Sequence, residues 1–198
     1  MDRDSVSLQR AVELHLAEHG FPPDGGIGER WVVVGLGPIP ICFPNTKARR
    51  LATPIHDLNH VLSGYGHDAL GEAEIGAWEL GGGCKNYWAA WILNWSALLP
   101  GVARAPTRLL RAFARGRRTG NLYGGEIEQV RQRSVAELRE ELGLDEDYPV
   151  RPGDVALFAG VVCLAPVVAV IPGVAALVTS PLWLAAGAHR QHRSAAAP

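Results

Sequence analysis

One short motif constrains the fold of this chain more than any other feature. Residues 56–60 read HDLNH, and eleven further residues separate this run from Glu72. On an α-helix His56 and His60 lie one turn apart, and Asp57 lies about 100° around the axis from His56, so one arc holds all three. Glu72 would lie roughly 18 Å beyond His60 on the same straight helix. The chain must therefore turn back, and the glycines at positions 64, 66 and 71 are typical of a turn.

The motif predicts a metal site between two antiparallel helices. Its candidate ligands are His56, Asp57, His60 and Glu72. Imidazoles combined with carboxylates suit a divalent metal, and we expect zinc, with iron, manganese or cobalt as alternatives. So small a ligand set leaves room for water or substrate. An incidental origin stays open, because histidines one turn apart arise by chance and Asp57 would also be favoured in a first helical turn.

Two further carboxylates follow Glu72 in the sequence. Glu79 lies seven residues beyond Glu72, and Glu74 lies near it. A metal-bound histidine usually donates its other ring N–H to such a group. We therefore expect Glu74 or Glu79 to orient one of the histidines from behind the metal.

The motif and its surroundings resemble a known family. Residues 71–80 continue the motif as GEAEIGAWEL, residues 115–118 read RGRR, and residues 135–144 read VAELREELGL. Together these segments are similar to the signature of the coenzyme Q (ubiquinone) biosynthesis protein Coq4 family. The likeness covers approximately residues 5–145, and the ligand positions are its most specific part. The chain departs from the family in the run FPNTKARR at residues 43–50 and in a long apolar C-terminal extension.

The resemblance implies a mainly α-helical protein at a membrane surface that binds a divalent metal. It also implies an enzyme, a metal-dependent decarboxylase (lyase) that removes the C1 carboxylate of a polyprenyl-hydroxybenzoate intermediate oxidatively. The alternative is a non-catalytic prenyl-lipid-binding or scaffold protein of a biosynthetic complex, in which the metal is structural. An enzyme needs an open coordination position, whereas a scaffold needs only a closed one.

Candidate substrate contacts flank the motif on both sides. Cations that precede it could pair with an anionic substrate, although a solvated charge cluster is the alternative. Tryptophans at helical spacing in a predicted helix over residues 86–99 could line a groove for an isoprenoid tail, although plain core is the alternative. The cations are Lys47, Arg49 and Arg50, and the aromatic residues are Trp88, Trp91 and Trp95.

Composition indicates one helical domain over residues 1–150 with an extension over residues 151–198. The net charge of −1 gives no reason to expect nucleic acid as a partner. Three widely spaced cysteines form no disulfide framework, which favours a reducing compartment. The charged start shows no secretory signal, so we expect the cytoplasmic side of a membrane.

The extension carries no charged residue from Val155 to Ala188. A straight helix of that length would reach roughly 50 Å, against about 30 Å for a bilayer core, so it must bend or break. Pro172-Gly173 near the middle favours a hairpin of two helices inserted in the membrane, and one kinked span is the alternative. A hairpin buried in the protein or in a homo-oligomer interface also stays open. Recurring arginines, at positions 104, 108, 111 and 115, could add contacts to anionic lipid.

The N-terminal segment predicts a helix that Ser5 or Ser7 caps and that ends near His19. Residues 15–19 spell HLAEH, which matches the inverted zinc-peptidase motif. The motif lies against a helix end, and no downstream ligand stands out. We therefore interpret His15 and His19 as residues of an ordinary surface helix. The β-branched run at residues 32–34 predicts a short strand.

Overall fold

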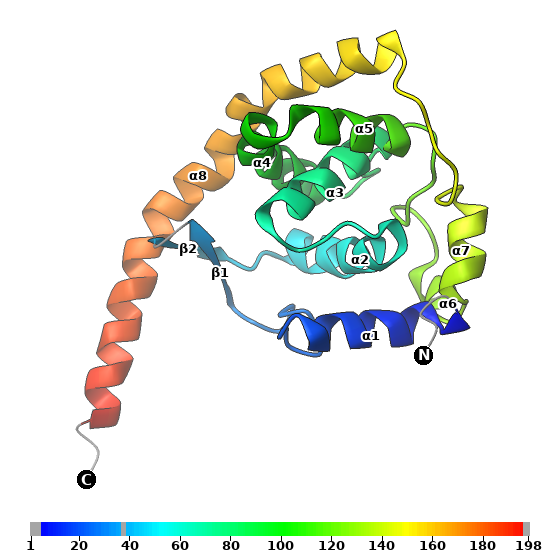
Figure 1. The fold of residues 1–198 in the computed structure, drawn as a ribbon. Helices are drawn as coiled ribbons and strands as arrows, with labels where there is room; N and C mark the ends of the chain where they lie inside the picture. The colour runs from blue at the N-terminus through cyan, green and yellow to red at the C-terminus, as the bar shows by residue number, and fades with distance from the viewer. Residues whose placement is uncertain (1–4, 37–38, 196–198) are drawn as a thin grey trace.

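The computed structural model describes residues 5–36 and 39–195, and this part of the chain is mainly α-helical, as predicted (Figure 1). It contains eight helices and one two-stranded antiparallel sheet, in which Trp31 lies opposite Pro44. The elements are α1 (Leu8–Glu18), β1 (Trp31–Leu36), β2 (Ile39–Pro44), α2 (Lys47–Ser63), α3 (Ala69–Gly82), α4 (Trp88–Arg104), α5 (Pro106–Gly116), α6 (Ile127–Arg131), α7 (Val135–Glu141) and α8 (Pro152–Ala195).

The predicted return between the two motif helices is confirmed. Thr46 caps the start of α2 by accepting a hydrogen bond from the backbone N–H of Arg49, at 3.3 Å. Gly64 ends α2 at a φ of 79°, a left-handed conformation that glycine adopts without steric cost. Asp68 then caps α3 by accepting a hydrogen bond from the N–H of Gly71, at 2.6 Å. The short loop 64–68 joins the two helices and brings the Glu72 carboxylate within 3.5 Å of His56 Nε2.

Helix α3 lies at the centre of the fold, between α2 on one side and α4 and α5 on the other (Figure 1). Trp78 is fully buried there and donates its indole N–H to the hydroxyl of Thr119, at 2.9 Å. Gly76 allows the backbone of α4 at Asn94 to approach closely, where any side chain would press on it. The functional positions on α3 are therefore held by packing from several directions.

Helix α8 corrects the predicted C-terminal hairpin. One continuous helix runs from Pro152 to Ala195 and curves over α4, α5 and β2 (Figure 1). The prediction of two helices joined near Pro172-Gly173 is wrong, while the requirement that the segment bend holds. An interior proline removes one backbone hydrogen bond and kinks a helix without ending it when packing supports both sides. Such support is present, because Phe158 and Ala165 are buried before the proline and Ala176 is buried after it.

Polar contacts fix α8 to the rest of the molecule. The carboxylate of Asp154 accepts hydrogen bonds from Arg117, at 2.9 Å, and from Arg118, at 2.7 Å. Trp95 donates its indole N–H to the carbonyl of Val161, at 3.1 Å. The backbone N–H of Cys42 in β2 donates to the hydroxyl of Ser180, at 2.8 Å. These contacts hold one side of α8 against β2, α4 and the segment that follows α5.

The other side of α8 is an apolar stripe open to solvent. Within the described residues, Pro152–Pro181 is long and apolar enough to cross a membrane, with a mean hydropathy of 2.6 in its most apolar window. Only 12% of that window is buried. The stripe recurs at three- and four-residue intervals, and its members are Leu164, Val167, Ile171, Val174 and Val178.

Several arginines of α5 and of the residues that follow it bind groups within the protein. Arg115 donates to the backbone carbonyls of Ser63, at 3.0 Å, and Leu144, at 2.7 Å. Arg117 and Arg118 pair with Asp154 as described above. An arginine surface for lipid headgroups is therefore smaller than the sequence suggested.

Candidate metal centre

Three of the four predicted ligands converge between α2 and α3. One ligand atom from each of His56, His60 and Glu72 lies within 4.8 Å of the other two. The Nε2 atoms of the two histidines are 3.1 Å apart, and the Glu72 carboxylate lies 3.5 Å from His56 Nε2 and 3.4 Å from His60 Nε2. Zinc at about 2.0 to 2.2 Å from each atom would fit among ligands at these separations. We call these three residues the candidate metal centre.

The second nitrogen of each histidine fixes its tautomer. His56 Nδ1 faces the Glu79 carboxylate at 3.1 Å, and His60 Nδ1 faces the carbonyl oxygen of Tyr65 at 3.0 Å. Both partners are acceptors, so each Nδ1 carries a proton and donates. In the neutral imidazole, each Nε2 then keeps a lone pair directed at the centre, which is the form that a metal requires.

Glu79 orients His56 from behind, as predicted. Its side chain is fully buried, and it accepts four hydrogen bonds. Oε1 accepts from Asn59, at 2.8 Å; Oε2 accepts from Asn94, at 2.6 Å, from Tyr123, at 3.0 Å, and from His56. A buried carboxylate with this many donors has one defined position, and it fixes the plane of the imidazole.

Glu74 does not share this role, which corrects the other half of the prediction. Its carboxylate forms a two-point ion pair with Arg108 of α5, at 2.8 and 2.6 Å. Two residues along a helix correspond to about 200° of rotation, so Glu74 points away from the side that carries Glu72. Seven residues return almost to the same side, which is why Glu79 reaches the histidine and Glu74 does not.

Asp57 is not part of the converging group. Its carboxylate lies against Gly25, in the segment that connects α1 to β1, where a β-carbon on that glycine would contact it. Burial raises the pKa of Asp57 to about 6, although His56, His67 and Arg49 partly offset this effect. Asp57 therefore lies at the edge of the metal centre, facing the neighbouring cavity, and its role as a ligand stays a prediction.

The charges of the centre balance one another in the metal-free protein. Burial alone would raise the pKa of Glu72, but its contacts with the His56, His60 and His67 rings and the charge of His56 hold it well below its usual range. Burial disfavours the charged form of His56, yet the carboxylates of Glu79 and Glu72 outweigh this effect and raise its pKa well above the usual range. Burial lowers the pKa of His60. Protonated His56 thus lies between the carboxylates of Glu72 and Glu79. A bound divalent cation would supply the positive charge in its place.

A cavity of about 660 Å³ adjoins the centre. His56 and Glu72 form part of its wall, and Asp57 and Arg49 lie beside them. Its other lining residues are largely apolar, and they come from the α1–β1 segment, the sheet and α4: among them are Phe21, Trp31, Val32, Phe43, Ala90, Leu93 and Ala97. The volume is typical of a site for a small organic ligand.

The predicted substrate contacts divide between this cavity and other places. Among the three cations only Arg49 lines the cavity, and its guanidinium donates to the Asn45 side chain at 3.1 Å. Lys47 and Arg50 are exposed outside the lining. Because burial is the largest effect, the pKa of Arg49 is lowered from its usual value.

None of the three predicted tryptophans lines the cavity beside the candidate metal centre, so their role in substrate binding stays a prediction. Trp95 packs toward α8, Trp91 donates to the carbonyl of Lys85, at 3.0 Å, and Trp88 is 58% exposed. The side of α4 that lines the cavity carries smaller residues instead, at positions 90, 93, 94 and 97. The tryptophans do lie on a helix, as their spacing predicted, but α4 turns a different side toward the cavity.

Sequence reasoning missed several residues of the site. Asn59, Asn94 and Tyr123 form the hydrogen-bond shell of Glu79, and Tyr123 lies in a loop with no recognisable motif. His67 lies in the loop 64–68 and donates from Nδ1 to Glu72 Oε1, at 3.1 Å. The only feature of the sequence that could have indicated His67 is its position five residues before Glu72.

Comparisons of this chain with protein-family models, curated proteins and solved structures found no match.

Proposed function

We propose that this protein is a metal-dependent enzyme that acts on a prenylated aromatic acid, as its resemblance to the Coq4 family implies. The observation that carries this proposal is the position of His56, His60 and Glu72 in the wall of a largely apolar cavity. Glu72 is 38% exposed, so the centre is open on the cavity side, as an enzyme requires. A structural metal site would more commonly be closed by a fourth protein ligand.

The protein residues would bind and orient such a substrate. The apolar lining would hold the aromatic ring and the first part of the prenyl chain, while Arg49 would pair with the ring carboxylate. Asp57, with its raised pKa, could exchange a proton with a phenolic oxygen near neutral pH. The metal would supply Lewis-acid polarisation of the carboxylate or the phenolic oxygen.

The reaction class that we propose is oxidative decarboxylation at C1 of a polyprenyl-hydroxybenzoate. Replacement of the ring carboxyl by a hydroxyl consumes one dioxygen, two protons and two electrons from an external reductant, and it yields carbon dioxide and water. The assay therefore needs a reductant as well as air. Loss of carbon dioxide without a new hydroxyl would indicate simple decarboxylation instead.

We also propose that the exposed stripe of α8 lies on a membrane surface that supplies this substrate. The stripe faces away from the domain, and Val167 is 68% exposed and Ile171 is 58% exposed. A helix held along one side by the domain can lie in the headgroup region without spanning the bilayer. Burial of this apolar side would drive association, because Arg108, Arg115, Arg117 and Arg118 already bind groups within the protein.

The test is native mass spectrometry followed by turnover. Protein purified with its natural contents should carry about one divalent metal per chain at the candidate metal centre, together with a prenylated aromatic lipid. The metal-loaded protein, a short-chain prenyl-hydroxybenzoate, air and a reductant should yield the hydroxylated product by mass. Lipid binding with no turnover, and a metal whose removal lowers only thermal stability, would instead favour the scaffold function.

Arg49→Met provides the matched variant for substrate binding. It should raise KM for the acid while leaving metal content unchanged, because Arg49 donates to Asn45 and is not one of the three residues of the candidate metal centre. Arg50→Met, on the exposed side of the same helix, should leave both unchanged. Equal effects of the two substitutions would contradict the assigned role of Arg49.

A further inference from the structure

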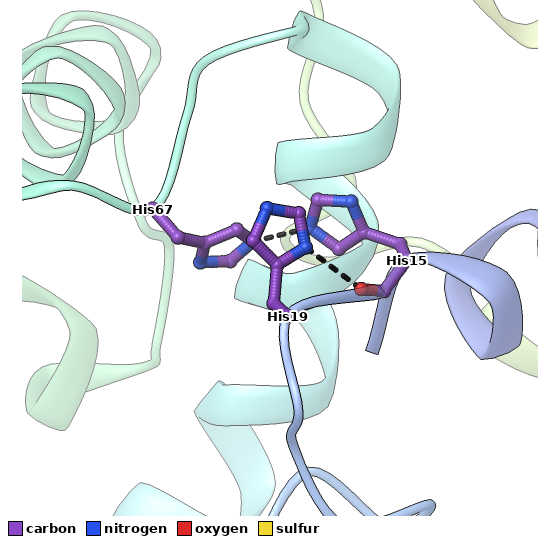
Figure 2. A group of neighbouring side chains, drawn as sticks. All are labelled: His15, His19 and His67. Atoms are coloured by element: carbon purple, nitrogen blue, oxygen red, sulfur yellow. Dashed lines mark hydrogen bonds between the residues drawn. The ribbon is translucent and has the colours of Figure 1, made fainter. Parts of the chain in front are cut away.

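A second group of histidines lies beside the candidate metal centre. One ring nitrogen from each of His15, His19 and His67 lies within 4.8 Å of the others. His15 and His19 lie at the end of α1, whereas His67 comes from the α2–α3 loop, and the three rings face one another (Figure 2). Their ring centroids are 4.4 to 4.8 Å apart. We call these residues the second histidine cluster.

The hydrogen bonds of His19 and His67 use the Nδ1 atom of each ring and leave Nε2 for a ligand. His19 Nδ1 donates to the carbonyl oxygen of His15 at 2.8 Å (Figure 2). His67 Nδ1 donates to Glu72 at 3.1 Å. Because both partners are acceptors, the neutral rings keep a lone pair on Nε2. His67 Nε2 faces His15 Nε2 in direct contact. Two facing imidazole nitrogens need either a proton or a cation between them.

We propose that His15, His19 and His67 bind a second divalent transition metal of the zinc class. Imidazole nitrogens suit zinc, copper, iron and nickel, and three histidines with one open position form a common zinc arrangement. His19 is exposed, so the open position faces solvent and would take water. This proposal differs from the sequence interpretation, which treated His15 and His19 as residues of an ordinary surface helix. This proposal is independent of the proposed function, since it concerns metal binding alone.

The second site is separate from the candidate metal centre but connected to it through one side chain. The His67 ring stacks on the His60 ring with centroids 3.9 Å apart, and it stands between Glu72 and the second site. The intervening ring keeps the two metals further apart than the about 3.5 to 4 Å of a carboxylate-bridged pair. A metal on His67 Nε2 would make its Nδ1–H a stronger donor to Glu72.

The second metal would also fix one wall of the cavity. It would join α1 to the α2–α3 loop, two segments that are far apart in the sequence. Phe21 follows His19 by two residues, lines the cavity, and places its ring 5.5 Å from that of His67. Metal binding at this position would hold Phe21 and the chain beyond it against the cavity mouth.

Zinc stoichiometry of the full chain tests the proposal. Chelator-treated protein is titrated with zinc chloride and dialysed, and its zinc content is measured by mass spectrometry. Wild type should retain two equivalents, His15→Gln/His19→Gln should retain one, and His56→Gln/His60→Gln should retain the other. Addition of the second equivalent should slow hydrogen exchange in residues 19–26. One equivalent in wild type, unchanged in His15→Gln/His19→Gln, would overturn the proposal and leave a hydrogen-bonded stack of rings.

Two further variants keep the result decisive. His19→Gln alone changes an exposed side chain, so it should fold normally and weaken the second equivalent at least 10- to 100-fold, the loss that even an outer-shell partner causes. Unchanged affinity in this variant would refute the proposal. His189→Gln/His192→Gln removes the histidine pair near the C-terminus of the sequence and should retain two equivalents. Loss of zinc there would assign the second equivalent to the C-terminal pair.

Discussion

Glu79→Gln is the substitution that examines the site most directly. Glu79 accepts from three donors at Oε2 and from Asn59 at Oε1, all inside the protein. A glutamine can keep its oxygen toward the three donors only by turning its NH₂ toward the NH₂ of Asn59. Asn59 cannot rotate its amide to compensate, because its Oδ1 accepts the backbone N–H of Leu122 at 3.2 Å.

The magnitude follows from this conflict. Removing one partner from a buried charged network costs about 3 to 5 kcal/mol, so the free energy of unfolding should fall by about that amount. Loss of the carboxylate behind His56 should weaken zinc binding about 10- to 100-fold. Urea unfolding of the metal-free protein measures the first effect, and zinc competition against a chromophoric chelator measures the second.

Glu74→Gln is the matched control, since it removes the same charge from the same helix. Arg108 is 57% exposed, so the loss of this ion pair should cost about 1 kcal/mol or less and should leave zinc affinity unchanged. Equal zinc affinity in Glu79→Gln and wild type would refute the orienting role of Glu79. Equal losses of stability in the two variants would refute the argument about its buried hydrogen bonds.

Three further predictions concern protons and membranes. Folding raises the pKa of Asp57 to about 6, so the folded state holds this proton more tightly and stability falls as pH rises from 4 to 6. The free energy of unfolding of Asp57→Asn, relative to that of the metal-free wild type, should therefore rise by about 3 kcal/mol between pH 4 and pH 7. A difference in urea unfolding that does not change with pH would contradict this. The raised pKa of His56 predicts that zinc binding near neutral pH releases about one proton, which calorimetry in buffers of different ionisation enthalpy would detect. Serine at positions 164, 167 and 171 should reduce co-sedimentation with liposomes while α8 stays folded, since these side chains are 53%, 68% and 58% exposed; unchanged vesicle binding would exclude the stripe as the anchor.

The spacing of the motif predicted the part of the site that local geometry determines. Helical periodicity and the glycines at 64 and 66 were sufficient to place His56, His60 and Glu72 together. The same periodicity favours Glu79 over Glu74, because seven residues, unlike two, return to the same side of a helix. It could not decide whether Asp57, at the edge of that arc, faces the metal or the cavity, because the α1–β1 segment that meets it is distant in sequence.

Tertiary packing explains where the structure departs from the sequence predictions. Spacing showed that Trp91 and Trp95 share a side of α4, but nothing local indicated that α8 covers this side and that small residues line the cavity. The break expected at Pro172-Gly173 assumed an unsupported helix, whereas the domain holds α8 on both sides of the proline. His67 was missed because it lies in a loop, where no periodicity exists.

The position of α3 explains how a buried charged site is tolerated in a fold of this size. Glu72 lies in the first turn of α3, where the helix dipole favours a negative charge, and Glu79 lies at the buried end. Both carboxylates meet donors on elements that pack around α3, so their charges are matched by groups whose positions the core already fixes. The α3 segment therefore links stability to metal binding, because a substitution that loosens its packing would displace Glu72 and Glu79 together.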